Sequence, residues 1–398
     1  MISVDEAVSR ITGAFTVLPA ENVAVAGASN RVLAEDVVAP IDHPPAPMSV
    51  MDGYAVRAGD ARVGAELAVV GTAPAGHPFN GAVRAGQAVR VFTGGVVPDG
   101  ADAVVIQEDT APGARNSVVI NAQPRVGENV RERGLDFKTG ETLFERGHRI
   151  TARDVALLAA ADMAELSVIR KPKVAIVATG DELSLPGQPR GPGGIVASST
   201  YAIQAMVRNW GGEPFDVGIL ADRPEEFVRL AKETRDADLI VTQGGASVGD
   251  HDLVQSALAP LGFVLDFWKI AMRPGKPLIF GRLKGTPFLG FPGNPVSAMV
   301  CSILFLEPAI AAMLGTEYRA PIMRAKLGAP LKANGKRQEY VRARLSFADG
   351  VAIAEPFALQ DSSMQKVFAR ADALIIRAIG APPAGKGDDV QVLLLDRA

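Results

Sequence analysis

Short apolar runs alternate with helical patterns between residues 173 and 314, and this alternation constrains the fold more than any other feature of the chain. The run KVAIVAT at 173–179 shows no polar alternation, which is typical of a strand buried on both faces of a parallel sheet. Similar runs recur at 213–220, 237–243 and 286–291, separated by amphipathic stretches. This repeated strand–helix order predicts an open, mostly parallel sheet with helices on both faces.

Helical patterns connect these predicted strands. They lie at 199–212, 223–236 and 252–261, and the fourth strand leads into an apolar helix that starts near residue 295. Pro224 falls in the first turn of the second helix, where proline is well tolerated.

Two other helices are marked by capping signals. Ser3 and Glu6 have the spacing of a capping box, so the first 15 residues predict an amphipathic helix rather than a signal peptide. The same spacing joins Thr151 to Asp154 at the start of a later helix.

The segments on either side of the α/β block are rich in short strands. Residues 50–135 contain valine-rich runs separated by glycine turns, which predicts a small β domain, and short strands return after residue 318. The expected fold class is therefore α/β plus all-β. The expected domains are a discontinuous N-terminal domain (1–43 and 137–168), a small β-rich domain (44–136), the α/β domain (169–317) and a C-terminal β domain (318–398).

Composition excludes several classes of function. The net charge of −3 argues against non-specific nucleic-acid binding. The only cysteine, Cys301, lies in an apolar run, so it is expected to pack rather than react, and a single thiol fits a reducing cytoplasm. The most apolar stretch, near 296–314, is interrupted by Glu307 and Pro308. We therefore expect a cytoplasmic protein with neither a nucleic-acid nor a membrane partner.

Three predicted strand ends carry unusual loops: ATGDEL at 178–183, TQGGASVGDHD at 242–252 and FPGNPVSA at 291–298. In a parallel sheet these ends lie at one edge, so the loops are expected to converge there, where ligands of open α/β sheets bind. The glycine turns and the helix that begins at Asn294–Pro295 can offer backbone N–H groups to an anion.

The same loops also carry acids: Asp181, Glu182, Asp250 and Asp252. Carboxylates repel a bare phosphate, but they fit an anion that is bridged by Mg²⁺. The alternative is that each loop is an ordinary turn with solvated acids.

Basic residues surround a Pro-Gly turn at 269–276. Lys269, Arg273 and Lys276 could hold an oxyanion beside the acidic loops, or could form a solvated basic turn. Arg337 and Arg342 are expected on one strand and, if it is strictly extended, on opposite faces. Neither a Walker loop nor a GxGxxG fingerprint is present.

The segments MDGYA, FTGGVVPDGADAVV, RGLDFKTGE, ATGDEL, GGASVGDHD, RPGKP and PGNPVSA follow one another from about residue 49 to 298. As an ordered set they resemble the molybdopterin molybdenumtransferase family, which includes bacterial MoeA and the E domain of gephyrin and of its plant counterpart. The N-terminal helix and the segment GKRQEYVR extend the resemblance to almost the whole chain.

The resemblance implies an elongated, multidomain homodimer with a molybdopterin-binding α/β domain and β-rich accessory domains. It implies a Mg²⁺-dependent transferase that inserts molybdate into adenylylated molybdopterin and releases AMP, the last step of molybdenum cofactor biosynthesis. The active site would lie across the subunit interface, and molybdopterin adenylyltransferase is a candidate partner.

The motifs and the resemblance together select the candidate site residues. Catalytic roles are expected for Asp52, Thr93, Asp136, Glu182, Asp222, Asp252, Lys269 and Arg273. Contacts with the pterin substrate or the oxyanion are expected for Gly180, Asp181, Gly244, Gly245, Ser247, Gly249, Lys276, Pro292, Gly293, Asn294, Pro295, Ser297, Arg337 and Arg342. The expected Mg²⁺ ligands are Glu182, Asp250 and Asp252.

The chain departs from the family pattern at three positions. Gln243 and Ala246 flank the glycine loop where the family often has serine and valine, and Arg273 stands where lysine is common. Two alternative functions remain open at this point. One is a scaffold protein that binds the cofactor without catalysis, and the other is the preceding adenylylation of metal-free molybdopterin.

Overall fold

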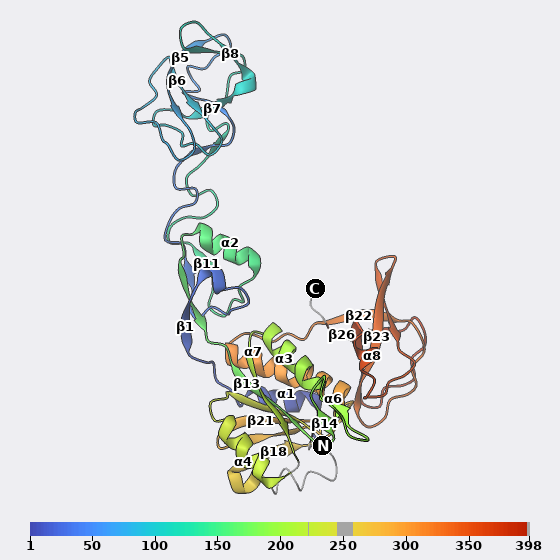
Figure 1. Cartoon of the computed structure of the whole chain (residues 1–398). Helices are drawn as coiled ribbons and strands as arrows, with labels where there is room; N and C mark the ends of the chain where they lie inside the picture. The colour runs from blue at the N-terminus through green and yellow to red at the C-terminus, as the bar shows by residue number, and fades with distance from the viewer. Residues whose placement is uncertain (222, 245–257, 396–398) are drawn as a thin grey trace. The chain divides into compact units, whose positions relative to one another are not determined.

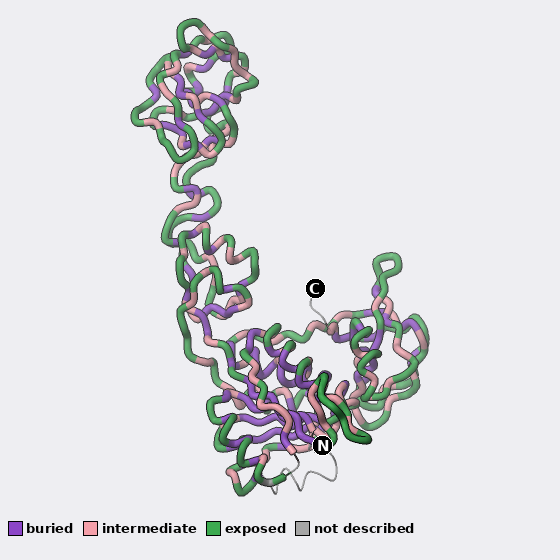
Figure 2. Tube along the Cα trace, in the orientation of Figure 1, coloured by how far each residue is buried: buried purple, intermediate pink, exposed green. Residues whose placement is uncertain are grey.

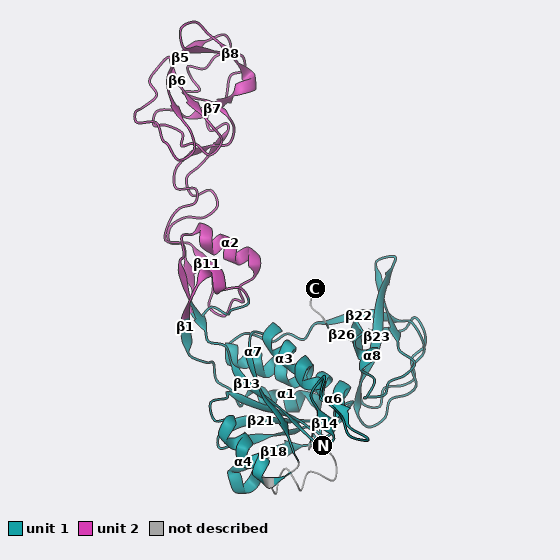
Figure 3. Cartoon of the chain, in the orientation of Figure 1, with its two compact units in different colours: residues 1–21, 30–34, 167–398 teal, residues 22–29, 35–166 magenta. Residues whose placement is uncertain are grey.

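The computed structural model describes residues 1–221, 223–244 and 258–395. The chain folds into two compact units (Figures 1 and 3). Unit 1 comprises residues 1–21, 30–34 and 167–398, and unit 2 comprises residues 22–29 and 35–166. Strands β1 (Ala20–Ala24) and β12 (Glu165–Ile169) contain two of the four points where the chain passes from one unit to the other, and the other two follow residues 29 and 34.

A mostly parallel sheet forms the centre of unit 1. Its strand order is β16-β13-β17-β21-β20-β18, in which the first four strands are parallel and β20 pairs antiparallel with both β21 and β18. The bounds are β13 Lys173–Thr179, β16 Glu213–Leu220, β17 Leu239–Gln243, β18 Phe263–Trp268, β20 Ile279–Leu283 and β21 Thr286–Phe291. Almost every residue of β13 is buried, as the unbroken apolar run predicts (Figure 2). The predicted open sheet is confirmed.

Helices cover both faces of this sheet. On one face α1 (Val4–Thr12), α3 (Ser199–Asn209) and the segment from α6 to α7 share a core with Val174, Ile176 and Val241. On the other face α4 (Pro224–Glu233) packs its Phe227 and Leu230 against alternate residues of the same strands. The predicted helix at 252–261 lies mostly outside the described residues, which resume at Leu258, directly before the short turn η3 (Ala259–Leu261).

The longest helical segment of unit 1 is its central core element. It consists of α6 (Pro295–Cys301), the π-helical turn η4 (Ser302–Leu306) and α7 (Glu307–Leu314). The segment is apolar and long enough to cross a membrane, but 94% of its most apolar window is buried inside the protein. Pro308 does not end the helix. It has no N–H for the usual bond four residues back, and the wider π turn lies just before it.

A β-barrel completes unit 1. The strand order β19-β23-β24-β22-β26-β25 closes on itself because β25 also pairs with β23, and alanine, valine and leucine side chains fill the interior. The bounds are β19 Met272–Arg273, β22 Ile322–Leu327, β23 Gln338–Ala348, β24 Val351–Pro356, β25 Ala373–Arg377 and β26 Asp389–Leu394, with the short helix α8 at Gln365–Phe368. The two-residue strand β19 belongs to the basic loop of the α/β part, so it attaches that loop to the barrel. A small pair, β14 (Leu183–Ser184) and β15 (Ile195–Val196), follows β13.

Unit 2 is mainly β structure. Among its described residues one sheet has the order β7-β4-β6-β5-β9-β8, and the pairs β10–β3 and β11–β2 lie outside it. The sheet strands are β4 Gly53–Val56, β5 Glu66–Ala73, β6 Gln87–Val91, β7 Ala103–Ile106, β8 Thr110–Pro112 and β9 Ser117–Ile120. The remaining elements are β2 Val37–Val38, β3 Met48–Ser49, β10 Val130–Arg131, β11 Thr142–Phe144, α2 Ala152–Ala160 and the turns η1 Val25–Gly27 and η2 Gln107–Asp109.

The N-terminal helix differs from expectation in two respects. Its Ser3 hydroxyl accepts a hydrogen bond from the Glu6 N–H at 3.1 Å, but Glu6 pairs with Arg10 at 3.5 Å instead of completing the capping box. Helix α1 also belongs to unit 1, because Val4, Ala7 and Ile11 are buried in the α/β core, so residues 1–43 are divided between the units. The second predicted capping box, Thr151 with Asp154, is confirmed.

Phe305 tests the importance of the central helical segment. Its side chain is fully buried, so Phe305→Ala is expected to lower the free energy of unfolding of unit 1 by about 3–5 kcal/mol. Phe347 in β23 is 71% exposed, and Phe347→Ala should change the same quantity by less than about 0.5 kcal/mol. Chemical denaturation followed by circular dichroism measures both, and equal effects would contradict this core assignment.

Candidate functional site

The three predicted strand-end loops begin side by side. Ala178 of β13 is in register with Gln243 of β17, and Gln243 is in register with Phe291 of β21. The Gly244 N–H donates to the Phe291 carbonyl at 3.1 Å, so the second loop leaves its strand against the third. The predicted convergence of the loops is therefore confirmed for their described residues.

Glycines make close approach possible at this edge. Gly180 and Gly244 have φ values of +146° and +104°, which side-chain-bearing residues rarely adopt. A Cβ added to Gly244 would lie 2.4 Å from the Thr179 carbonyl oxygen, and one added to Gly293 would lie 3.8 Å from the Gly244 Cα. Gly180 is buried, Gly244 is half-buried and Gly293 is exposed. We call these three glycines at the ends of neighbouring strands the glycine cradle.

Gln243 connects two of the loops. Its Nε2 donates to the Gly293 carbonyl at 2.8 Å, which fixes the turn before α6 against the end of β17. Gln243 and Thr179 are both buried, and their Oε1 and Oγ1 atoms have no hydrogen-bond partner within the described part of the chain. Gln243, which departs from the family pattern, therefore joins two loops through its bond to Gly293 and leaves its Oε1 as an acceptor beside the glycine cradle.

Glu182 is the expected Mg²⁺ ligand that the structure describes. Its carboxylate lies against the glycine cradle, because a Cβ added to Gly180 would be 2.5 Å from Glu182 Oε2. The other two expected ligands, Asp250 and Asp252, lie outside the described residues, as do Asp222, Gly245, Ser247 and Gly249. Within residues 1–221, 223–244 and 258–395, no group of three or more His, Cys, Asp or Glu side chains lies close enough together to hold a metal ion.

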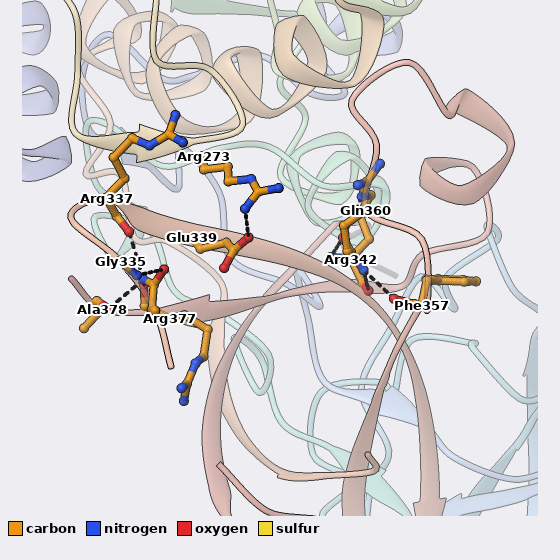
Figure 4. A network of polar contacts seen from close by, with 10 residues as sticks. Arg273, Gly335, Arg337, Glu339, Arg342, Phe357, Gln360, Arg377 and Ala378 are labelled. Atoms are coloured by element: carbon orange, nitrogen blue, oxygen red, sulfur yellow. Dashed lines mark hydrogen bonds and ion pairs between the residues drawn. The ribbon is translucent and has the colours of Figure 1, made fainter. Parts of the chain in front are cut away.

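A basic cavity of about 320 Å³ lies beside the helix α6. It forms where β19 pairs with β23, in the register Met272 with Gln338 and Arg273 with Glu339. Four cationic side chains line it, together with polar groups of α6 and the barrel: Arg273, Lys276, Arg337, Arg342, Asn294, Ser297, Glu339, Tyr340, Gln360, Asp361 and Ser362. We call this the basic cavity; part of its polar network is drawn in Figure 4.

Arg342 is the most buried cation of the basic cavity, with 2% of its surface exposed. Its Nε donates to Gln360 Oε1 at 3.0 Å (Figure 4). Its Nη1 donates to the Asp361 carbonyl at 2.7 Å. Burial lowers the pKa of this guanidinium and the neighbouring Arg273 adds to the effect, whereas the Asp361 carboxylate opposes it. A buried cation held mainly by neutral oxygens favours an anion in the cavity.

The expected orientation of the barrel arginines is wrong. Arg337 precedes β23 instead of lying on it, so the alternation of an extended strand does not apply, and both arginines line the basic cavity. Arg342 is also not a solvated surface residue. The segment that supports it, Gln360 to Ser362, was not expected, although its polar run QDSS is visible in the sequence.

The basic loop reaches the cavity through Arg273 and Lys276. Arg273 Nη1 lies 3.4 Å from Glu339 Oε1, and its side chain is 58% exposed, so it remains accessible to a ligand. Gly275 between them has φ of +105°, and an added Cβ would lie 2.6 Å from Cys301 Sγ. Cys301 itself is buried, and burial raises the pKa of its thiol, so it packs as expected and does not act as a nucleophile.

Lys269 does not join the other two cations. It has φ of +73°, and its ammonium lies 3.3 Å from the centre of the Trp268 ring, a cation–π contact. It is not among the residues that line the basic cavity. The expected grouping of three cations is therefore wrong for Lys269.

The start of α6 borders the same cavity. Asn294 is its N-cap without a side-chain bond, Pro295 is the first residue, and the Val296 N–H already donates to the Ser362 carbonyl at 3.0 Å. Ser297 is 4% exposed and lines the basic cavity. Pro292 is buried in the preceding turn. At the start of α6, Pro295 has no N–H and the Val296 N–H is already bonded, so the main contribution of this helix to the cavity is the Ser297 hydroxyl group.

Unit 2 contains the other expected site residues. Asp52 Oδ1 accepts from the Thr93 N–H at 2.8 Å and from its hydroxyl at 2.9 Å. These two bonds, and to a lesser extent the charge of Arg90, hold the pKa of Asp52 below its usual value. Asp136 does not share this pair; it lines a separate cavity of unit 2 with His43.

Three family profiles match successive segments of this chain. Family profiles described as the MoeA N-terminal region (domain I and II), the probable molybdopterin binding domain and the MoeA C-terminal region (domain IV) match residues 2–161, 175–312 and 324–395.

Individual relatives are similar over most of their length. The Molybdopterin molybdenumtransferase of Nostoc sp. is 36% identical over 92% of this chain and 87% of its own, and that of Bacillus subtilis is 34% identical over 99% and 94%. A crystal structure of the molybdopterin biosynthesis MoeA protein of Pyrococcus horikoshii has a TM-score of 0.85 at 30% identity and covers 99% of both chains.

Replacement of Thr93 tests the Asp52 pair. Thr93→Val removes the hydroxyl bond but keeps the N–H bond, so the pKa of Asp52 should rise partway toward its ordinary value of about 4. Because the pKa is depressed in the folded protein, the pair stabilises unit 2 above that ordinary value and is lost as pH falls through the lowered one. Carboxyl ¹³C NMR measures the pKa; an unchanged value would show that the hydroxyl has no part in it.

Proposed function

Because the chain belongs to the molybdopterin molybdenumtransferase family and functions in molybdenum cofactor biosynthesis, we propose that it inserts molybdate into adenylylated molybdopterin and releases AMP. The observation that carries this proposal is the buried Arg342 in a cavity that it shares with three further cations, Arg273, Lys276 and Arg337.

In this proposal the basic cavity binds molybdate. Molybdate is a tetrahedral dianion with four acceptor oxygens, and guanidinium and ammonium groups on several sides match its charge and geometry. The cavity carries four cationic and two acidic side chains, Glu339 and Asp361, so it keeps an excess of positive charge. Ser297 contributes a hydroxyl group that can donate to a further oxygen.

The glycine cradle binds the phosphate part of the pterin substrate. Gly293 is exposed and Gly244 is half-buried, and neither carries a side chain, so an anion can approach their backbone more closely than side chains would permit. The free Oε1 of Gln243 offers an acceptor to a donor group of the same substrate. The two dithiolene sulfurs then bind molybdenum in the neighbouring cavity while one molybdate oxygen leaves as water with the two thiol protons. Water cleaves the phosphoanhydride and releases AMP.

Mg²⁺ binding at the first two loops is part of the proposal. The Glu182 carboxylate lies beside Gly180 of the glycine cradle, so it borders the proposed phosphate site, and Asp250 and Asp252 are the proposed further ligands. When bound, Mg²⁺ would neutralise the charge of the phosphoanhydride.

We also propose a homodimer in which Asp52, Thr93 and Asp136 of one copy act with unit 1 of the other, in the cytoplasm. The ionised Asp52, whose lone pairs are already oriented by Thr93, suits a role in positioning a donor group of the substrate. Molybdopterin adenylyltransferase is the proposed source of the adenylylated substrate.

Reconstitution tests the reaction. The protein is incubated with adenylylated molybdopterin, Mg²⁺ and molybdate, and AMP and the metal-bearing cofactor are measured. Molybdate-dependent AMP release supports the proposal. Cofactor binding without AMP release would favour a scaffold, and ATP consumption with metal-free molybdopterin would favour the preceding adenylylation step.

Arg342 is predicted to control molybdate affinity. Arg342→Gln removes a charge-assisted hydrogen bond, so the Kd for molybdate should rise about tenfold or more in isothermal titration calorimetry. Arg344, on the same strand but exposed and outside the cavity lining, provides the control Arg344→Gln, which should leave the Kd unchanged. Equal Kd values for the two folded variants would show that molybdate does not bind in this cavity.

Glu182 is predicted to control Mg²⁺ dependence. Glu182→Gln keeps the side-chain shape but removes a charged ligand, so the Mg²⁺ concentration for half-maximal AMP release should rise about tenfold. Glu213→Gln, an exposed change on β16 in the same sheet, is the control. A Glu182→Gln enzyme with normal Mg²⁺ dependence would exclude Glu182 as a ligand.

A further inference from the structure

Unit 2 contains a second cavity, of about 470 Å³, which we call the proline cavity. Its walls come from the segment around His43 to Met48 and from the segment that includes Arg131 and Asp136. The two segments are tied together, because the His43 N–H donates to the Phe137 carbonyl and the Asp136 N–H donates to the His43 carbonyl, both at 2.9 Å. The cavity is therefore built by main-chain pairing and does not depend on long side chains for its shape.

The apolar walls are suited to a flat ring. Pro44 and Pro45 are rigid, Met48 is adaptable, and Leu135 is 64% exposed at the cavity although it is a large apolar residue. The His43 ring is fixed by stacking on Phe137, with ring centres 5.3 Å apart and planes at 17°. An exposed leucine beside rigid flat groups is typical of a ligand pocket with preformed walls.

Two opposite charges complete the proline cavity. Arg131 and Asp136 both line it, and neither side chain has a hydrogen bond or ion pair with another described residue. A carboxylate accepts two parallel hydrogen bonds from an amino group and an adjacent ring N–H, and a guanidinium donates to a ring carbonyl. The heterocycle that offers these groups on one edge is a 2-amino-4-oxopyrimidine fused to a second ring.

From this geometry we infer that the proline cavity binds the pterin ring of the substrate, with Asp136 on its 2-amino edge and Arg131 on its 4-oxo group. The inference rests on the proposed function and adds the place on unit 2 where the ring is held. It also gives Asp136 a role in binding and orientation, and separates it from the Asp52–Thr93 pair.

Binding of pterin itself tests the inference without turnover. The full-length chain, labelled with ¹³C at its methionine methyl groups, is titrated with pterin and with lumazine, in which an oxo group replaces the 2-amino group. The Met48 signal, assigned with Met48→Leu, should shift and saturate with pterin. Lumazine should bind about tenfold more weakly or worse, because it presents an acceptor to the Asp136 carboxylate.

Variants make the test specific. Asp136→Asn should abolish the preference for pterin over lumazine, whereas Asp162→Asn should retain it, since Asp162 is exposed outside this cavity and its φ of +62° suits asparagine. A Met48 signal that does not move with pterin, equal affinity for the two rings, or a preference that survives Asp136→Asn would each overturn the inference.

Two further outcomes separate this inference from its alternatives. If a second copy of the chain fills the cavity, Leu135→Ser will change the sedimentation coefficient while pterin leaves Met48 unmoved, which also overturns the inference. If AMP release proceeds normally but no pterin preference is found, the proposed function stands and only this binding site is rejected.

Discussion

Burial of the Arg342 guanidinium is the physical constraint on which the account of this site depends. A buried cation loses its hydration, and the partners that replace it here are mainly the neutral oxygens of Gln360 and Asp361. The lowered pKa has the same cause. A cation in this situation is stabilised by any anion that enters the cavity, and the nearby Arg273, Lys276 and Arg337 strengthen that preference. The buried Arg342 of the barrel therefore favours binding of an anion in the cavity.

The connection between the barrel and the α/β part brings residues of both parts together around the basic cavity. Only two residues of β19 pair with β23, but they set Arg273 opposite Glu339 and direct the basic loop into the cavity. On the other side, the parallel register of β13, β17 and β21 gathers the glycine cradle, and the Gln243 bond to Gly293 holds the turn that leads into α6. Ser297 then lies where the α/β part meets the cavity. Strand pairing thus positions the two surfaces proposed to bind anions on one unit.

Much of this arrangement follows from the sequence, and the exceptions have identifiable causes. The apolar run at 173–179 predicted β13, and the parallel-sheet rule predicted that Gly180, Gly244 and Gly293 would meet, because both depend on regular periodicity. The place of Arg342 could not be predicted in the same way. Its burial depends on barrel closure and on Gln360, which are long-range events. Lys269 was misplaced because a left-handed backbone and the Trp268 ring redirect it.

The central claim is that the basic cavity is the binding site of molybdate. Crystals of the protein grown with molybdate and measured at the molybdenum absorption edge test this most directly. The account predicts an anomalous difference peak inside the cavity, within hydrogen-bond distance of Arg342 and at least one of Arg273, Lys276 and Arg337. A peak at another place on the chain, with none in this cavity, would contradict it.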